Sequence, residues 1–154
     1  MKKSKYALDK FESGKNCAQS VVLSFADDLK MNKETAEAMT SGFGAGMGRL
    51  HKTCGALTGS FMVIGRHYSL TENDSEEKSA KTNLKIQKLD SDFTNKFESS
   101  NCGVLIGTDL KTEEGREFFS ENNVKENICN DCVGYCVGWL EENLENLTEH
   151  DIKQ

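Results

Sequence analysis

The stretch that decides the fold is TCGALTGSFMVIGRHY, residues 53–68. On a helix drawn through it, apolar and small residues occur almost all round, and a helix of that composition is buried. Strand-like alternation of apolar and polar residues is nearly absent here and in the rest of the chain. The stretch therefore predicts a buried helix and, with it, an all-α fold.

Further helices are predicted on both sides of this stretch. On the predicted long helix that follows it, the steps of three and four between Ile86, Leu89, Phe93 and Phe97 indicate a face directed at the core. The predicted segments are about Lys5–Leu29, interrupted or bent near Ser13-Gly14, a helix capped by Asn32, a long helix opened by a capping box at Thr71–Asp74, a short helix after Cys102, Thr112–Glu121, and about Val124–Leu147.

The chain of 154 residues contains no proline. Proline marks turns and helix starts, so its absence suggests helices joined by short glycine, asparagine and serine turns. This length is enough for one core. We therefore expect a compact, single-domain, multi-helix bundle of six to seven helices that covers residues 1–154.

The net charge of −6, from 25 acidic and 19 basic residues, argues against nucleic acid or an anionic membrane as the main partner. Residues 1–14 contain no apolar segment of a signal peptide, and no apolar run approaches the roughly 20 residues that span a bilayer. We expect a soluble, cytoplasmic protein. Thiols stay reduced in the cytoplasm, so its cysteines favour metal binding or redox chemistry over structural disulfides.

Three of the six cysteines lie in CNDCVGYCVGW, residues 129–139. The i, i+3, i+7 spacing of Cys129, Cys132 and Cys136 places them on one face of a helix. A single buried cysteine often acts as a small apolar residue. Three on one face instead suit an iron–sulfur cluster or zinc, both of which take thiolate ligands. The C-x2-C-x3-C spacing matches no standard ferredoxin run, so residue type and facing carry this interpretation.

Glycine alternates with other residues from Gly42 to Gly48. A phosphate-binding loop would need a preceding strand and a different spacing, so we interpret this segment as a connection in which backbones approach closely. A second hypothesis is that N–H groups of the loop and of the start of the next helix bond a thiolate or a cluster sulfide.

The other three cysteines lie in longer, more specific contexts: Cys17 in NCAQSVVLSFA, Cys54 in TCGALTGSFMVIGRHY and Cys102 in NCGVLIGTDL. Together with Cys129, these segments resemble the family of redox-active proteins named for its C_GCAxxG_C_C pattern. The family's CGAxxG motif is matched by Cys54–Gly59. The resemblance extends from about Lys5 to about Leu144.

This resemblance implies a compact helical domain found in bacteria and archaea, often anaerobes. It implies four family cysteines, matched by Cys17, Cys54, Cys102 and Cys129, and a relation to the helical domain of split-Soret cytochromes, whose cysteines hold an iron–sulfur centre. Cys132 and Cys136 lie outside the four-cysteine signature. Six ligands could support a larger or second cluster, or four could bind it while two serve as redox thiols.

The histidines are weaker candidates. His51 lies three residues before Cys54 and could serve as a ligand or proton donor, but we interpret it, with His67 and His150, as a surface or satisfied core residue. No Ser-His-Asp arrangement can be argued from the sequence.

The leading hypothesis is an iron–sulfur redox protein of anaerobic metabolism. It would transfer electrons or carry out reductive chemistry, as a possible oxidoreductase, with a redox partner protein or a small-molecule substrate. The candidate ligands are Cys17, Cys54, Cys102, Cys129, Cys132 and Cys136. The alternatives are a thiol–disulfide redox protein or sensor, a structural zinc-binding module, and plain core cysteines. The G-x-x-x-G pair Gly134 and Gly138 suggests close helix packing within the fold or across a homodimer.

Overall fold

The computed structural model describes residues 2–145 and 147. These residues form helices and no strand, with one isolated antiparallel bridge between Thr53 and Asn101. The elements are α1 (Lys3–Glu12), α2 (Cys17–Phe25), α3 (Lys33–Thr40), a 3-10 turn (Ser41–Phe43), α4 (Gly44–Met47), α5 (Gly55–Thr71), α6 (Ser75–Phe97), α7 (Cys102–Ile106), α8 (Glu113–Glu121), a π-helical turn (Lys125–Cys129) and α9 (Asn130–Asn143). The all-α prediction is confirmed.

The predicted number of helices was slightly low. Apart from the four-residue turn α4, whose inner residues are not in right-handed helical conformation, the described residues form eight helices. The interruption predicted near Ser13-Gly14 is confirmed and separates α1 from α2, because Gly14 has φ +103° and Asn16 starts a new helix. The Asn16 side chain accepts the N–H of Gln19, whose own side chain accepts the N–H of Asn16.

Two other predicted boundaries can be compared with the structure. Asn32 caps α3 as expected, through the N–H of Thr35. The capping box at Thr71–Asp74 was wrong, because Thr71 is still the last residue of α5 and Asp74 caps α6 through the N–H of Glu77. The cap therefore starts three residues later than the pattern indicated.

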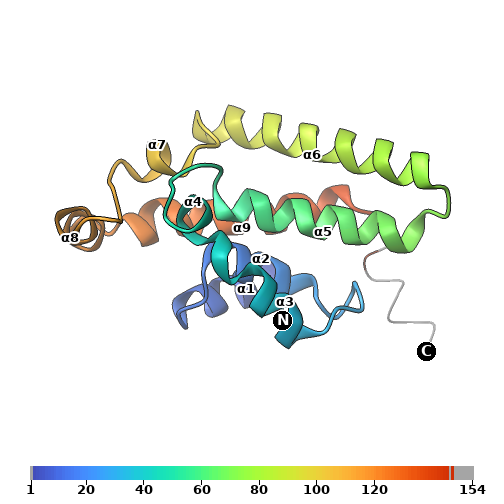
Figure 1. Ribbon diagram of the computed structural model, residues 1–154, viewed down its shortest axis with the longest axis horizontal. Helices are drawn as coiled ribbons and strands as arrows, with labels where there is room; N and C mark the ends of the chain where they lie inside the picture. The colour runs from blue at the N-terminus through green and yellow to red at the C-terminus, as the bar shows by residue number, and fades with distance from the viewer. Residues whose placement is uncertain (1, 146, 148–154) are drawn as a thin grey trace.

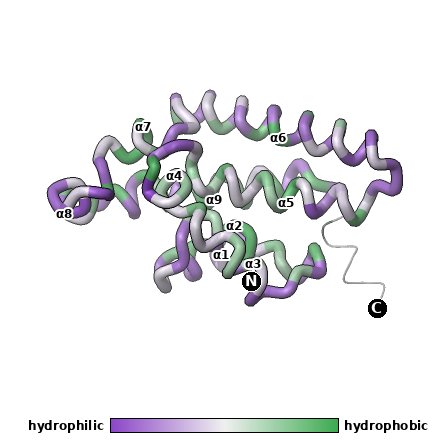
Figure 2. The backbone as a smooth tube through the Cα atoms, in the orientation of Figure 1, coloured by the Kyte–Doolittle hydropathy of each residue, from purple (hydrophilic) through white to green (hydrophobic). Residues whose placement is uncertain are grey.

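Helix α5 is the centre of the molecule, and α6 runs back along it after a tight connection (Figure 1). It packs against α2 on one side and against α6 and α9 on the others, which confirms the buried helix predicted for residues 53–68. Figure 2 shows the contrast in hydropathy, since α2 and α5 are largely hydrophobic while α6 is mostly hydrophilic along its outer course. The main core contains fully buried Phe25, Leu57, Phe93 and Leu140.

A second, smaller core lies at the end of the bundle where α5 begins. Cys102, Ile106 and Val124 are buried there, with Phe119 and Ile128 packed against them. Helices α7 and α8 project from this end in Figure 1. Because α5, α7 and the π-helical turn all begin or end here, this end of the bundle collects the cysteines. In the described part of the chain, no helix combines the length and apolar character needed to cross a membrane.

Candidate functional site

A mostly apolar cavity of about 230 Å³ lies between the main core and the smaller one. Five of the six cysteines line it: Cys17, Cys54, Cys102, Cys129 and Cys132. The remaining wall is made by side chains such as Phe11, Leu105, Ile106 and Phe119. Cys54, Cys102 and Cys132 are buried, while Cys17 and Cys129 are partly exposed. The structure thus brings together cysteines that are up to 115 residues apart in the sequence, from Cys17 to Cys132.

Three of these cysteines lie at helix starts. Cys17 is the first residue of α2 and Cys102 the first of α7, each directly after a capping asparagine. Asn16 accepts the N–H of Gln19 at 2.8 Å, and Asn101 accepts the N–H of Val104 at 2.9 Å. The similar segments 11–17 and 97–102 therefore form equivalent helix-to-cysteine junctions.

Cys54 occupies the position before α5 and is fixed by backbone pairing. Its N–H donates to the carbonyl of Ser100 at 2.9 Å, and the N–H of Cys102 donates to the carbonyl of Lys52 at 2.6 Å. These bonds flank the bridge between Thr53 and Asn101. The pairing holds Cys54 and Cys102 beside each other, although they are far apart in sequence.

The glycines of the Cys54–Gly59 motif explain how α5 approaches α2. A Cβ on Gly55 would lie 2.9 Å from the carbonyl oxygen of Phe43 and 3.2 Å from the Cβ of Cys17. A Cβ on Gly59 would lie 2.9 Å from the carbonyl oxygen and 3.0 Å from the Cα of Ala18. Any side chain at these positions would push the two helices apart. The motif is therefore a contact surface that brings Cys54 to Cys17.

The glycine-rich loop forms a left-handed turn against the same cavity. From Ala45 to Arg49 every residue has positive φ, between 50° and 69°, and Ala45 lines the cavity. A Cβ on Gly46 would lie 2.8 Å from the Cβ of Cys102. Close backbone approach, the interpretation favoured from the sequence, is confirmed. The N–H groups of His51 and Lys52 donate to the carbonyls of Ala45 and Gly46, so both close the turn rather than bond a sulfur.

The buried thiols interact in pairs, which sets their acidity. A hydrogen bond with Cys129, followed by burial, raises the pKa of Cys17 well above its ordinary value. A hydrogen bond with Cys54 and burial raise the pKa of Cys132 in the same way. Burial raises the pKa of Cys102 to about 12. Removing protons from these thiols is therefore unfavourable unless a positive charge compensates.

Cys54 is the exception. The hydrogen bond from the Cys132 thiol lowers the pKa of Cys54, and the backbone N–H groups of Ala56 and Leu57 lower it further, in spite of burial. These N–H groups belong to the first turn of α5, where the helix dipole favours negative charge, although neither makes a capping bond of ordinary geometry to the sulfur. Cys54 is thus the thiol best prepared to become a thiolate.

The sixth cysteine, Cys136, lies outside this arrangement. It is fully buried in the main core and does not line the cavity. Burial is the largest cause of its raised pKa, the negative charge of Cys54 raises it further, and a hydrogen bond with Ser60 lowers it. Cys136 therefore interacts with Cys54 but does not line the cavity, and its role as a ligand stays a prediction.

His51 contacts the site, but through Cys102 rather than Cys54. Its Nδ1 lies 3.9 Å from the sulfur of Cys102, and its Nε2 lies 3.1 Å from Oδ1 of Asp109 and accepts the N–H of Leu110 at 3.0 Å. The sequence interpretation of His51 as an ordinary surface or core residue missed this contact. A signal was available in the segment LIGTDL after Cys102, whose aspartate is Asp109.

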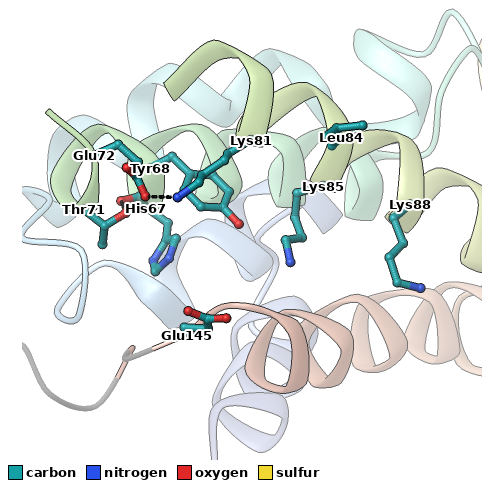
Figure 3. Close-up of a pocket in the computed structure, with 9 residues that line it drawn as sticks. All are labelled: His67, Tyr68, Thr71, Glu72, Lys81, Leu84, Lys85, Lys88 and Glu145. Atoms are coloured by element: carbon teal, nitrogen blue, oxygen red, sulfur yellow. Dashed lines mark hydrogen bonds and ion pairs between the residues drawn. The ribbon is translucent and has the colours of Figure 1, made fainter. Parts of the chain in front are cut away.

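A larger cleft, of about 480 Å³, lies elsewhere, between α5, α6 and the segment after α9 (Figure 3). No cysteine lines it. Its lysines already have partners: Lys81 pairs with Glu72, Lys85 donates to the carbonyl of Asn143 at 3.0 Å, and Lys88 pairs with Asp92. This cleft therefore lacks both the thiols and the free charge that would make it a competing redox or anion site. His67 lines it, and His150 lies outside the described residues.

Within residues 2–145 and 147, no three side chains of histidine, cysteine, aspartate or glutamate converge on a point where they could hold a single metal ion. The cysteines stand around a space rather than at one point. A Cβ added at Gly134 or Gly138 would meet no atom of another segment within 4 Å, so the prediction that these glycines allow close packing within the fold is wrong for the described part of the chain.

Comparison with known proteins agrees with this geometry. No curated protein and no solved structure matches the chain. The family model described as "Putative redox-active protein (C_GCAxxG_C_C)" matches residues 15–143, a range that includes every cysteine of the cavity. The chain therefore belongs to the C_GCAxxG_C_C family of redox-active proteins.

Proposed function

We propose that the cavity holds an iron–sulfur cluster and that the protein is a redox protein working through it. The supporting observation is that five cysteines from five elements line one cavity whose other walls are apolar. The candidate ligands are Cys17, Cys54, Cys102, Cys129 and Cys132. Cysteine thiolates are the usual ligands of such clusters, and a space among the thiols suits a group made of several atoms better than a single ion.

When bound, the cluster would supply the site at which an electron is accepted and released. The chain's own residues would do the rest. Cys54 would be the first thiolate to bind, because its pKa is already lowered. The other thiols would lose their protons on binding, since the positive charge of iron offsets the cost of burying thiolates. Side chains such as Phe11 and Phe119 would exclude water.

The partly exposed thiols indicate where electrons would enter and leave. Cys17 and Cys129 lie on the more open side of the cavity, while Cys54, Cys102 and Cys132 are buried. A redox partner protein or a small-molecule substrate would exchange electrons on the side of Cys17 and Cys129. Whether the protein is itself an oxidoreductase depends on which of the two it meets.

Anaerobic purification followed by a visible spectrum and by iron, zinc and acid-labile sulfide analysis tests this proposal. We expect a coloured protein with iron and sulfide in comparable amounts, directly or after anaerobic reconstitution. A colourless, iron-free protein with titratable thiols after reconstitution would contradict it. Stoichiometric zinc without sulfide would support the structural zinc module instead.

A second candidate is a thiol–disulfide redox protein. Two observations favour it: the hydrogen-bonded pairs Cys17 with Cys129 and Cys54 with Cys132, and the lowered pKa of Cys54. Each pair could form one disulfide and release two electrons and two protons to an oxidant. Mild oxidation of the iron-free protein, followed by peptide mapping, should then recover these two disulfides. Random pairing, or no pairing, would leave the cluster as the better explanation.

A further inference from the structure

We propose that His51 is a positioning residue that donates its Nδ1–H to the sulfur of Cys102 and thereby raises the reduction potential of the redox centre. The inference rests on the proposed function, since it concerns a sulfur of the proposed centre. It adds a residue that lies outside the set of cysteines. Its support is the position of one imidazole ring among three neighbours, at Cys102, Asp109 and Leu110.

The first step concerns the proton on the ring. Nε2 faces a donor, the N–H of Leu110 at 3.0 Å, and an acceptor, the carboxylate of Asp109 at 3.1 Å. If Nε2 accepts from Leu110, the neutral ring carries its proton on Nδ1. If the ring is doubly protonated, Nε2 donates to Asp109 and Nδ1 again carries a proton. In both arrangements an N–H points at Cys102.

The second step excludes the one remaining protonation state of the ring. A neutral ring with its proton on Nε2 would direct the lone pair of Nδ1 at the sulfur 3.9 Å away. With Cys102 as a thiolate, two electron-rich atoms would then face each other, and the N–H of Leu110 would lose its acceptor. The repulsion at the sulfur decides between the arrangements, so a thiolate at Cys102 selects a ring that donates from Nδ1.

The ring is also held in place. The side chain of His51 is 12% exposed, and the residue has φ +57° at the end of the left-handed loop. Its carbonyl accepts the N–H of Gly103, and a Cβ on Gly103 would lie 3.1 Å from the Cβ of His51. The backbone of His51 is therefore fixed against the start of α7, and the ring has little freedom to turn away from Cys102.

A hydrogen bond to a ligand sulfur draws electron density from it and favours the reduced, more negative state of the centre. A charge-assisted hydrogen bond is strong enough to change the ratio of reduced to oxidised centre about tenfold. A tenfold change corresponds to ~59 mV for a one-electron couple.

The variants His51→Asn and His51→Gly form a matched pair for the test. Both residues tolerate positive φ, so neither strains the loop. Asparagine keeps an N–H donor one bond from Cγ, at the place of Nδ1, whereas glycine has no donor. In anaerobic redox titrations we expect H51N to stay close to the native potential and H51G to fall by about 59 mV. Equal potentials in H51G and the native protein, or equal shifts in both variants, would overturn the proposal.

A measurement on the iron-free, reduced native protein separates this proposal from the cluster itself. Long-range 1H–15N correlation spectra of the His51 ring should show a proton on Nδ1, either alone with the amide of Leu110 bonded to Nε2 or together with a second proton on Nε2 directed at Asp109. A proton on Nε2 alone would overturn the proposal. If reconstitution gives no iron, the proposed function fails, yet the spectrum still decides whether His51 donates to Cys102.

Discussion

Helices α5 and α9 both have a cysteine at or near their start and both contain a G-x-x-x-G pair, but these features have different surroundings in the two helices. Cys54 precedes α5, and Cys132 and Cys136 lie on α9. A hydrogen bond from the Cys132 thiol is the largest cause of the lowered pKa of Cys54, and the N–H groups at the start of α5 lower it further. On α9, a hydrogen bond with Cys54 and burial raise the pKa of Cys132, and burial is the largest cause of the raised pKa of Cys136. The hydrogen bonds that a thiol receives, and not its burial alone, therefore decide whether it is ready to become a thiolate.

The glycines of the same two helices repeat the contrast. Gly55 and Gly59 on α5 lie four residues apart, and so do Gly134 and Gly138 on α9. The first pair meets the backbone or Cβ atoms of other segments at 2.9–3.2 Å, while the second meets nothing within 4 Å. Identical G-x-x-x-G spacing is thus a tight helix contact in one place and an open helix surface in the other.

The largest expected effect is on iron content, which should differ between variants of Cys54 and Cys136. Cys54→Ser should abolish cluster binding while α5 still forms, because serine is a good residue at the position before a helix. Cys136→Ala should keep the native amount of iron per chain and lose only about 1–2 kcal/mol of stability by removing a buried sulfur. Iron and sulfide analysis, with circular dichroism as the folding control, checks both variants.

Two results would contradict the difference expected between these cysteines. Full iron content in C54S would remove the most reactive thiol from the ligand set. Loss of iron in a well-folded C136A would make Cys136 a ligand after all and would require α9 to move toward the cavity.

The helices could be predicted from the sequence because they depend on local patterns. The all-round apolar stretch at residues 53–68 identifies a buried helix wherever its neighbours lie. The convergence of Cys17, Cys54 and Cys102 could be predicted only through family resemblance. The physical cause, backbone contact at Gly55 and Gly59, depends on a partner helix that the motif itself does not specify.

The contacts of His51 could not be predicted because they are set by tertiary geometry. The residue is three positions from Cys54, and sequence distance pointed to that neighbour. A left-handed turn and the pairing of residues 51–54 with 100–103 turn it toward Cys102 instead. Five successive residues with positive φ are rare in L-amino-acid chains, and only the glycines among them carry a sequence signal.

The next effect is on stability and tests the contact of α5 with α2. Gly59→Ala should lower the free energy of unfolding by about 2–3 kcal/mol, because the new Cβ would overlap the backbone of Ala18. Gly65→Ala is the matched control on the same helix, since a Cβ there meets nothing within 4 Å, and it should gain about 0.5–1 kcal/mol. Urea unfolding of the iron-free, reduced protein measures both. Equal effects at the two positions would show that Gly59 does not limit the approach of the helices.

A further effect on stability is expected in alkaline solution. The pKa of Cys102 is raised to about 12 in the folded state from an ordinary value of 9.0. A thiol whose pKa is higher in the folded protein than in the unfolded chain stabilises the fold. This contribution is fully present below the pKa of the unfolded chain, and it is lost as the pH rises through the pKa of the folded protein. The iron-free protein should therefore lose stability between about pH 9 and 12.

Cys102→Ala is the control for this pH dependence. The variant should show a shallower loss of stability over the same range, because its unfolded chain has one thiol fewer to ionise. Cys54→Ala should not make the loss of stability with pH shallower. The pKa of Cys54 is lowered in the folded protein, so its contribution to stability is present above the pKa of the unfolded chain. Urea titrations at several pH values in reducing buffer give the comparison. Identical slopes of stability against pH for the native protein and C102A would mean that burial does not raise the pKa of Cys102.

The smallest effect concerns the glycines of α9. Gly134 lies within the helix, is partly exposed, and has nothing within 4 Å of where a Cβ would be. Gly134→Ala should therefore raise the free energy of unfolding by about 0.5–1 kcal/mol, because alanine has the higher helix propensity and restricts the unfolded chain. The same change at Gly138 should act alike and additively. A loss of stability, especially one that depends on protein concentration, would instead show that this surface packs against a second copy of the chain, since alanine would then disturb a close contact that glycine permits.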